Sequence, residues 1–249
     1  MTDLATRRSA LVTGASRGIG LGIASSLARQ GYGLTITARD AAALESVATD
    51  LLTMGAPRVL PVAADLADRE AAEQVIHEHA AEFDSMDALI LNAGIGTAGP
   101  IGDYPMKRFD KSVEVNLRAP FDLLQRALPL LRTGAREHPD RGSKVVALSS
   151  LTGVYAEPGL AAYGATKAAM LSLVETLNAE ESAQGVSGTA LAPGYVETDM
   201  SAWIQDKIPA NTMISVDDII ALVDAVLRLS SRAVVSRLVI TRAGAGLQA

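Results

Sequence analysis

Short apolar runs alternate along the chain with longer stretches in which apolar positions recur every three to four residues. The short runs are rich in Val, Ile, Leu and Thr and show no polar alternation, which is typical of strands buried on both faces of a sheet. They predict strands at residues 9–14, 33–38, 59–64, 87–92, 144–150, 187–193 and 237–241. The periodic stretches between them predict helices at residues 18–30, 41–54, 69–83, 105–132, 161–184 and 216–229.

The alternation of strands and helices predicts an α/β fold, because a parallel sheet needs a crossover, usually a helix, between successive strands. The chain has 249 residues, and a chain of this length buries about 70–75% of its unfolded surface. No linker, internal repeat or low-complexity segment divides it. We therefore predict a single domain that spans residues 1–249.

Composition narrows the class of protein. Aromatic residues make up 4% of the chain and hydrophobic residues 49%, so the core must consist mainly of Ala, Val, Leu and Ile. The net charge of −6, without a basic stripe, argues against nucleic acid as a partner. There is no cysteine, hence no disulfide or thiolate metal site. No secretory signal and no apolar stretch of about 18 residues is present, which predicts a cytoplasmic protein without a membrane segment.

A glycine-rich turn follows the first predicted strand and opens the first helix. It reads "LVTGASRGIGLGIA" (11–24), with Gly14, Gly18 and Gly20 in the spacing G-x3-G-x-G. Such a turn lets backbone N–H groups approach a pyrophosphate, and the helix N-terminus favours its negative charge. The position of the turn in an α/β pattern predicts a dinucleotide site.

The same segment has a second interpretation. "GASRG" (14–18) also fits the nucleophile elbow of a serine hydrolase, with Ser16 as nucleophile. That fold needs several strands before the elbow, and it needs a histidine partner. His77 and His79 lie on a charged helix and are predicted to be solvated, and His138 lies in a predicted loop. His77 and His79 also face different ways on a helix, so we predict no metal site.

A tyrosine and a lysine lie one helical turn apart in the alanine-rich run "AAYGATKAAM" (161–170). Tyr163 and Lys167 therefore share one face of the predicted helix. In isolation the pair would be a surface tyrosine and a solvated lysine. Its meaning depends on the rest of the chain.

The chain resembles the short-chain dehydrogenase/reductase family, including its carrier-protein reductases, from about residue 9 to 200. The resemblance rests on the order and spacing of "TGASRGIG" (13–20), "ADL" (64–66), "NAG" (92–94), "VNL" (115–117), "SS" (149–150), "YGATK" (163–167) and "PGYVETDM" (193–200). It implies a Rossmann-type doubly wound sheet of seven parallel strands in the order 3-2-1-4-5-6-7, with helices on both faces. It also implies hydride transfer between a nicotinamide cofactor and a carbonyl or alcohol.

The resemblance places the family's catalytic tetrad at Asn116, Ser150, Tyr163 and Lys167. Lys167 and the nicotinamide charge would favour the Tyr163 phenolate and lower the pKa of that side chain from about 10 toward neutral. A tyrosine with such a pKa is a suitable general acid or base for a carbonyl/alcohol pair. Ser150 would donate a hydrogen bond to the same substrate oxygen.

The role of Asn116 has an independent basis in the sequence. Pro120 lies four residues later and lacks an N–H group, so within a helix it leaves the Asn116 carbonyl without its usual donor. The resemblance implies that this carbonyl holds a water in a proton relay that reaches Lys167. The alternative is that Pro120 only kinks the helix while Asn116 packs against its neighbours.

The resemblance also implies the residues that bind the cofactor. Asp65 would accept a hydrogen bond from the adenine amino group, although it could instead be a helix N-cap; Asn92 would tie loops together, and Val196 and Thr198 would meet the nicotinamide carboxamide. The full set is Gly14, Ser16, Arg17, Gly18, Ile19, Gly20, Arg39, Asp65, Leu66, Asn92, Ala93, Gly94, Tyr163, Lys167, Pro193, Gly194, Val196 and Thr198.

The end of the second strand predicts NADP rather than NAD. Enzymes that choose NAD typically have an acidic residue there, which binds the ribose 2′-hydroxyl. This chain has Ala38 and then Arg39, while Asp40 comes one place late and can cap the next helix. Arg39 and Arg17 would both reach a 2′-phosphate.

The substrate is predicted to be a medium-sized, fairly hydrophobic ketone or alcohol. The residues expected around it are Gly96, Thr97, Leu151, Tyr155, Tyr195, Trp203, Ile204 and Met213, and residues 199–213 resemble a short lid. The long helices 105–132 and 161–184 pack against symmetry copies in the family, which implies a homodimer or homotetramer, with the tetramer favoured. A non-catalytic nucleotide-binding regulator on the same fold is the remaining alternative, but such a protein should have lost Tyr163 or Lys167.

Two positions depart from the family pattern. Gln184 stands where carrier-protein reductases often have a basic residue, which leaves an acyl-carrier partner open. The segment "RLVITRAGAGLQA" (237–249) lacks the Asp-Gly-Gly turn that many relatives carry after the last strand. The assembly is therefore predicted less firmly than the site.

Overall fold

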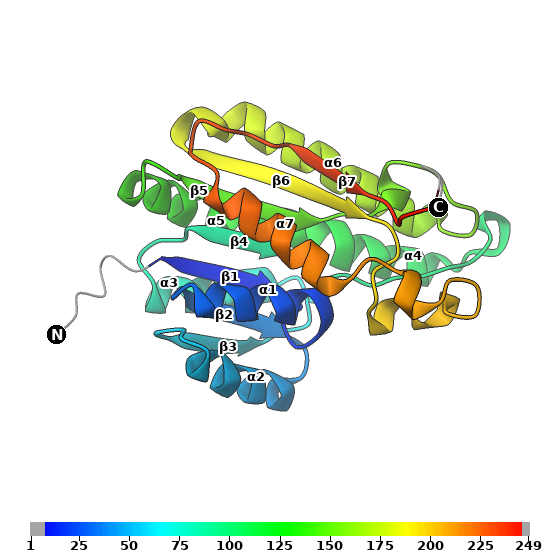
Figure 1. Cartoon of the computed structure of the whole chain (residues 1–249), viewed down its shortest axis with the longest axis horizontal. Helices are drawn as coiled ribbons and strands as arrows, with labels where there is room; N and C mark the ends of the chain where they lie inside the picture. Colours follow the sequence, from blue (N-terminus) through cyan, green and yellow to red (C-terminus); the bar gives the residue numbers. More distant parts are fainter. Residues whose placement is uncertain (1–7, 246–249) are drawn as a thin grey trace.

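A computed structural model describes residues 8–245 of the chain. One parallel seven-stranded sheet runs through the molecule in the order β3-β2-β1-β4-β5-β6-β7 (Figure 1). This order confirms the predicted fold class. The strands are β1 (Ser9–Thr13), β2 (Gly33–Ala38), β3 (Val59–Ala63), β4 (Ala88–Leu91), β5 (Ser143–Leu148), β6 (Val186–Pro193) and β7 (Arg237–Ile240).

Helices cover both faces of the sheet, so that the strands have two apolar cores. Along β1, Ala10 and Val12 join one core while Leu11 joins the other. The first core packs against α1 (Gly18–Arg29), α2 (Ala41–Thr53) and α7 (Val216–Arg228), and the second against α3 (Ala71–Glu82), α5 (Ala119–Glu137) and α6 (Ala161–Glu181).

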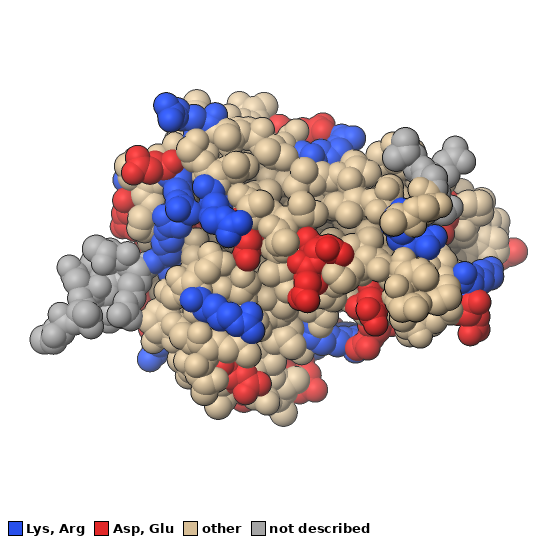
Figure 2. All heavy atoms as spheres, viewed as in Figure 1, with Lys and Arg blue, Asp and Glu red and all other residues tan. Residues whose placement is uncertain are grey.

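On the face shown in Figure 2, acidic and basic side chains both occur, and no basic stripe crosses it.

The strand order reverses at β1, because β2 lies on one side of it and β4 on the other. Two loops therefore diverge at the carboxyl ends of β1 and β4 and leave a crevice between them. In open α/β sheets ligands bind in this crevice. The topology thus brings the glycine-rich turn after β1 beside the "NAG" segment after β4.

The predicted helix 105–132 differs from the structure in its form and in its end. It consists of α4 (Met106–Val113), a π-helical turn η3 (Glu114–Arg118) and α5, which continues to Glu137. The wider turn ends two residues before Pro120, whose missing N–H breaks the ordinary hydrogen-bond ladder. The helix continues past residue 132, and Gly134 lets it lie close to the Met86 carbonyl, where a Cβ would clash.

His79 corrects a second prediction, since it is fully buried rather than solvated. Its Nδ1 lies 2.8 Å from the Thr35 hydroxyl, and its Nε2 lies 3.4 Å from the Ser85 carbonyl oxygen. His77, two residues earlier on α3, is exposed, as the helical spacing requires. The charged residues of α3 suggested a solvated helix, but its other face packs on the sheet.

Burial lowers the pKa of His79 to about 4, although the hydrogen bond to the Ser85 carbonyl raises it. The unfolded chain, with an ordinary histidine pKa near 6.5, therefore binds an extra proton between about pH 4 and pH 6.5. Stability is expected to fall as the pH falls through that window, by about 3 kcal/mol from this side chain.

His79→Gln tests this expectation, because an amide does not titrate. In urea unfolding at pH 7, 6, 5 and 4, the wild type should lose about 3 kcal/mol more than this variant over that pH range. His77→Gln, which removes the exposed histidine of the same helix, should follow the wild type. Parallel curves for the wild type and His79→Gln would contradict the assignment.

Candidate active site

A cavity of about 1300 Å³ opens at the carboxyl ends of the strands. It brings together segments that follow β1, β2, β3, β4, β5 and β6. Predicted cofactor and catalytic residues line it, namely Gly14, Ser16, Arg17, Gly18, Ile19, Arg39, Asp65, Leu66, Asn92, Ala93, Gly94, Ser150, Tyr163, Lys167, Pro193, Gly194, Val196 and Thr198. Of the residues predicted for these two roles, Gly20 and Asn116 lie outside the lining.

The glycine-rich turn has the conformation that its glycines allow. Gly14 and Gly18 have φ angles of +66° and +56°, a region that side-chain-bearing residues rarely adopt. Gly20 does not line the cavity, but a Cβ there would clash with the Gly14 carbonyl oxygen and the Asn92 amide. Gly20 therefore allows α1 to begin close against the turn, while the other two glycines shape the turn.

The start of α1 is compatible with an anion. The first turn of α1 holds no acidic residue, and the Arg17 side chain at its N-cap makes no capping hydrogen bond. The backbone N–H groups of this end and its partial positive charge are therefore available to a phosphate. None of the three histidines lines the cavity, so Ser16 has no histidine base there and the hydrolase interpretation loses its support.

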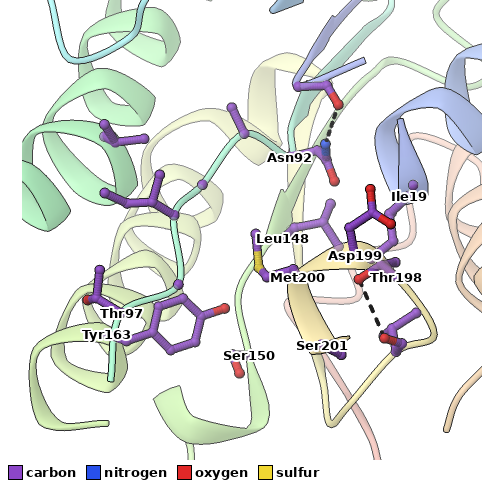
Figure 3. A pocket seen from close by; sticks show the side chains of 18 of the residues that line it. Ile19, Asn92, Thr97, Leu148, Ser150, Tyr163, Thr198, Asp199, Met200 and Ser201 are labelled. Carbon is purple, nitrogen blue, oxygen red and sulfur yellow. Dashed lines mark hydrogen bonds between the residues drawn. The ribbon is translucent and has the colours of Figure 1, made fainter. Parts of the chain in front are cut away.

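Asn92 ties the two diverging loops together, as the sequence predicted. Its Nδ2 donates to the carbonyl oxygens of Thr13 and Gly14, at 2.9 and 3.2 Å. Its backbone N–H donates to the Thr13 hydroxyl at 2.9 Å. These bonds fix the width of the crevice between β1 and β4 (Figure 3).

Tyr163, Lys167 and Ser150 meet at the other wall of the cavity. The first two lie on α6, and Ser150 is the N-cap of a short 3-10 helix η4 (Leu151–Gly153), two residues beyond β5. Ser150 lies beside the hydroxyl end of Tyr163 (Figure 3), and its side-chain oxygen accepts from the N–H and the hydroxyl of Thr152 at 3.3 and 3.0 Å. The Lys167 ammonium lies 5.6 Å from the centre of the Tyr163 ring.

Lys167 is buried and held by the backbone. Its ammonium donates to the Leu148 carbonyl oxygen at 2.7 Å, and the Ser149 hydroxyl donates to the Lys167 carbonyl oxygen at 2.7 Å. Burial lowers the pKa of Lys167 to about 8. Its charge is therefore present at neutral pH but lost more readily than that of an exposed lysine.

In the protein alone the pKa of Tyr163 is raised, whereas the lowering predicted for the state with a bound nicotinamide stays a prediction. Burial raises the pKa of this phenol, and the neighbouring Ser150 side chain offsets only part of that effect. The reason is that desolvation of the phenolate outweighs the attraction of the protein's own groups. Lowering this pKa would need positive charge beyond what the chain supplies.

The Asn116 side chain has a structural role. It is buried within the π-helical turn; its Oδ1 accepts from the Ile95 N–H at 2.8 Å and its Nδ2 donates to the Ile95 carbonyl oxygen at 3.0 Å. This two-bond clamp holds the loop after β4. The packing alternative therefore describes the side chain, while the predicted water on the main-chain carbonyl stays a prediction.

The residues expected near the adenine lie at one end of the cavity. Arg39 is exposed there, and Asp40 accepts from the Ala43 N–H at 3.1 Å as the N-cap of α2, as predicted. Asp65 is not a helix N-cap, since α3 begins six residues later; its carboxylate accepts from the Ala67 N–H within a turn. Its side chain thus stabilises the turn at the mouth of the cavity.

Arg17 makes a contact that the sequence did not predict. Its guanidinium pairs with Asp199 at 3.1 Å, and both side chains are largely exposed. An exposed pair of this kind contributes little free energy. Arg17 can therefore exchange this carboxylate for another anion at small cost.

The substrate side of the cavity contains part of the predicted set and some further residues. Gly96, Thr97, Leu151, Tyr195 and Trp203 line it, whereas Tyr155, Ile204 and Met213 do not. Sequence reasoning missed Arg108, Lys111 and Glu157, which also line it. Glu157 stands in the loop "YAEPGL" before α6, and its position just upstream of the tyrosine motif is a signal that could have drawn attention to it.

The predicted lid segment 199–213 contains two short 3-10 helices, η6 (Asp199–Ile204) and η7 (Ala210–Thr212). Met200 in η6 is one of the residues over the centre of the cavity (Figure 3). Within residues 8–245, no group of histidine, aspartate and glutamate side chains is arranged to hold a metal ion. Over the same residues, no helix is long and apolar enough to cross a membrane.

Comparison with known proteins adds independent information. The family model described as short chain dehydrogenase matches residues 8–209. A 3-oxoacyl-[acyl-carrier-protein] reductase of Staphylococcus aureus is 33% identical over 203 residues, which cover 81% of this chain and 79% of the relative.

Two solved structures share the fold across nearly the whole chain. An alcohol dehydrogenase from the archaeon Thermococcus sibiricus, complexed with 5-hydroxy-NADP, has a TM-score of 0.85 and 28% identity and covers 96% of this chain and 97% of its own. A 3-oxoacyl-[acyl-carrier protein] reductase from Brucella melitensis, in complex with NAD, has a TM-score of 0.84 and 28% identity, with coverages of 94% and 95%. The two neighbours thus differ in both cofactor and described activity.

Proposed function

The chain belongs to the short-chain dehydrogenase family, and on this premise we propose that it is an NADP(H)-dependent oxidoreductase acting on a carbonyl or secondary alcohol group. One observation carries the proposal: the glycine-rich turn and the group of Ser150, Tyr163 and Lys167 line the same cavity. The first supports a dinucleotide, and the second supplies a proton donor beside a hydrogen-bonding serine and a cation. A non-catalytic regulator would have no need of the second group.

The residues present fit a dinucleotide. The positive-φ glycines, the acid-free N-terminus of α1 and the exposed Arg39 would hold its phosphates, and Lys167 has two further N–H groups for its ribose hydroxyls. When bound, the nicotinamide supplies or accepts the hydride. Arg39 and Arg17 support NADP, because both are cations at the cavity and the strand end lacks the acidic residue that favours NAD.

Tyr163 would donate its proton to the substrate oxygen when a carbonyl is reduced. Its raised pKa keeps the phenol protonated at neutral pH, which is the state that reduction requires. Ser150 would bind the same oxygen and hold it within reach. Lys167 would stabilise the phenolate that remains, since its ammonium is close to the ring and still charged near neutral pH.

We also propose a homotetramer and a lid. The two long helices α5 and α6 resemble those that pack against symmetry copies in relatives, and Phe121 on α5 is 51% exposed.

The segment 199–213, with Met200 over the cavity, would close on bound substrate.

A cofactor and substrate screen tests the proposal. NADPH should raise the melting temperature of the protein, and absorbance of the reduced cofactor should fall when a panel of ketones is added. The carbonyl-free mixture is the control for slow cofactor decay. A melting temperature unchanged by both NADPH and NADH, together with no turnover of any ketone, would reject the proposal.

A further inference from the structure

Two polar side chains meet on the substrate side of the cavity from distant parts of the chain. Glu157 lies in the loop that leads into α6, and Tyr195 follows β6. The Tyr195 hydroxyl donates to Glu157 Oε1 at 2.6 Å, and both residues line the cavity. The backbone holds each of them, because Leu160 N–H donates to the Glu157 carbonyl oxygen and Ile214 N–H donates to that of Tyr195.

The second carboxylate oxygen of Glu157 has no partner. Oε2 is buried, and within residues 8–245 no protein group hydrogen-bonds with it. A buried acceptor without a donor is unfavourable, and such groups in proteins are usually explained by a water or a ligand. The torsion that orients a carboxyl group is soft, so a ligand donor in the cavity can reach this group through a small rotation.

The hydrogen-bonding capacity that remains at this pair is that of acceptors. The Tyr195 proton is already committed to Glu157, and a carboxylate has no proton to donate. The pKa of Tyr195 is raised by burial and then by Glu157 and Tyr163, so the phenol keeps its proton. A ligand at this pair must therefore bring the donor, and a carboxylate or ether group offers none.

Cations that line the same cavity argue for a neutral donor. Arg108 and Lys111 line the cavity, and the positive charge of Arg242 lowers the pKa of Tyr195. They would repel an ammonium group but not a hydroxyl. Tyr163, the proposed proton donor, lines the same cavity as the pair.

We propose that Glu157, supported by Tyr195, determines substrate specificity by accepting a hydrogen bond from a hydroxyl group that the substrate carries apart from its reacting carbonyl. The substrate class is then the hydroxyketones and the corresponding diols. The inference rests on the proposed oxidoreductase function and adds to it the group that the substrate must present. A site with a buried acceptor rejects an analogue without the donor strongly, because the acceptor is left unpaired.

Matched ketones test this inference. The substrates are 4-hydroxy-2-butanone, 5-hydroxy-2-pentanone and 6-hydroxy-2-hexanone, each compared with its methoxy and its dimethylamino counterpart, the latter protonated at neutral pH. At the chain length that reacts fastest, kcat/KM for the hydroxyketone should exceed that for the methoxyketone by about tenfold or more. It should also exceed that for the dimethylamino ketone.

Glu157→Gln is the decisive variant, because it keeps the shape and places an amide donor where the carboxylate offers only acceptors. Its hydroxy-to-methoxy ratio of kcat/KM should fall to about two or below. Glu45→Gln, at an exposed position on α2 outside the cavity, should retain the wild-type ratio.

The possible outcomes distinguish a failure of this inference from a failure of the proposed oxidoreductase function. No turnover with any ketone would reject the proposed function and the inference with it. Turnover without a hydroxyl preference in the wild type would reject the inference alone, whether or not the variant folds. A Glu157→Gln enzyme that keeps the wild-type ratio, or a wild type that prefers the dimethylamino ketone, would do the same.

Discussion

Tyr163→Phe is expected to lower kcat for carbonyl reduction by about a thousandfold, while the Kd for NADPH changes by less than about threefold. The substitution removes one hydroxyl and little volume, so the cavity keeps its shape. General acid catalysis contributes about 10²–10⁴ in rate. The Ser150 hydroxyl cannot replace the lost proton donor, because an aliphatic alcohol is a far weaker acid than a phenol.

The measurement is kcat and KM with a reactive ketone, together with a fluorescence titration of NADPH. Tyr155→Phe is the matched control. Tyr155 comes just after the 3-10 helix η4 and does not line the cavity, so the loss of its hydroxyl should leave the rate nearly unchanged. A Tyr163→Phe enzyme that kept more than about a tenth of the wild-type rate, a loss below about 1.4 kcal/mol, would show that another group donates the proton.

The second large effect concerns the choice of cofactor. The ratio of kcat/KM for NADPH over NADH should be at least about 100 in the wild type, or roughly 2.7 kcal/mol. In Arg39→Asp it should collapse or invert. Arg39 is exposed at the cavity and can pair with a 2′-phosphate bidentately, whereas an aspartate there repels the phosphate and binds the 2′-hydroxyl.

Arg232→Asp provides a control with the same change of charge. Arg232 lies outside the cavity, so its replacement should leave the ratio unchanged and report only the effect of net charge. A wild type that used NADH as well as NADPH would overturn the assignment of Arg39 and Arg17. One of the two structural neighbours binds an NADP derivative and the other binds NAD, so the fold alone does not decide between the two cofactors.

The sequence by itself determined the fold and most of the cavity. Buried parallel strands are continuous apolar runs, so their periodicity marks them locally, and the family motifs then supplied the strand order. Residues that follow such strands must gather at one edge of the sheet, which is why the chain pattern alone places Gly14, Asn92 and Ser150 together. The helical spacing of Tyr163 and Lys167 likewise placed both on one face.

Only the tertiary structure decided what depends on contacts between distant segments. α5 continues to Glu137 with Gly134 packed against Met86, and His79 is buried because α3 turns that face to the sheet. The hydrogen bond between Tyr195 and Glu157 could not be predicted from the sequence of either segment alone. The pKa of Tyr163 rises because its surroundings remove water, and burial is a property of the whole packed cavity rather than of the residues next to it in the chain.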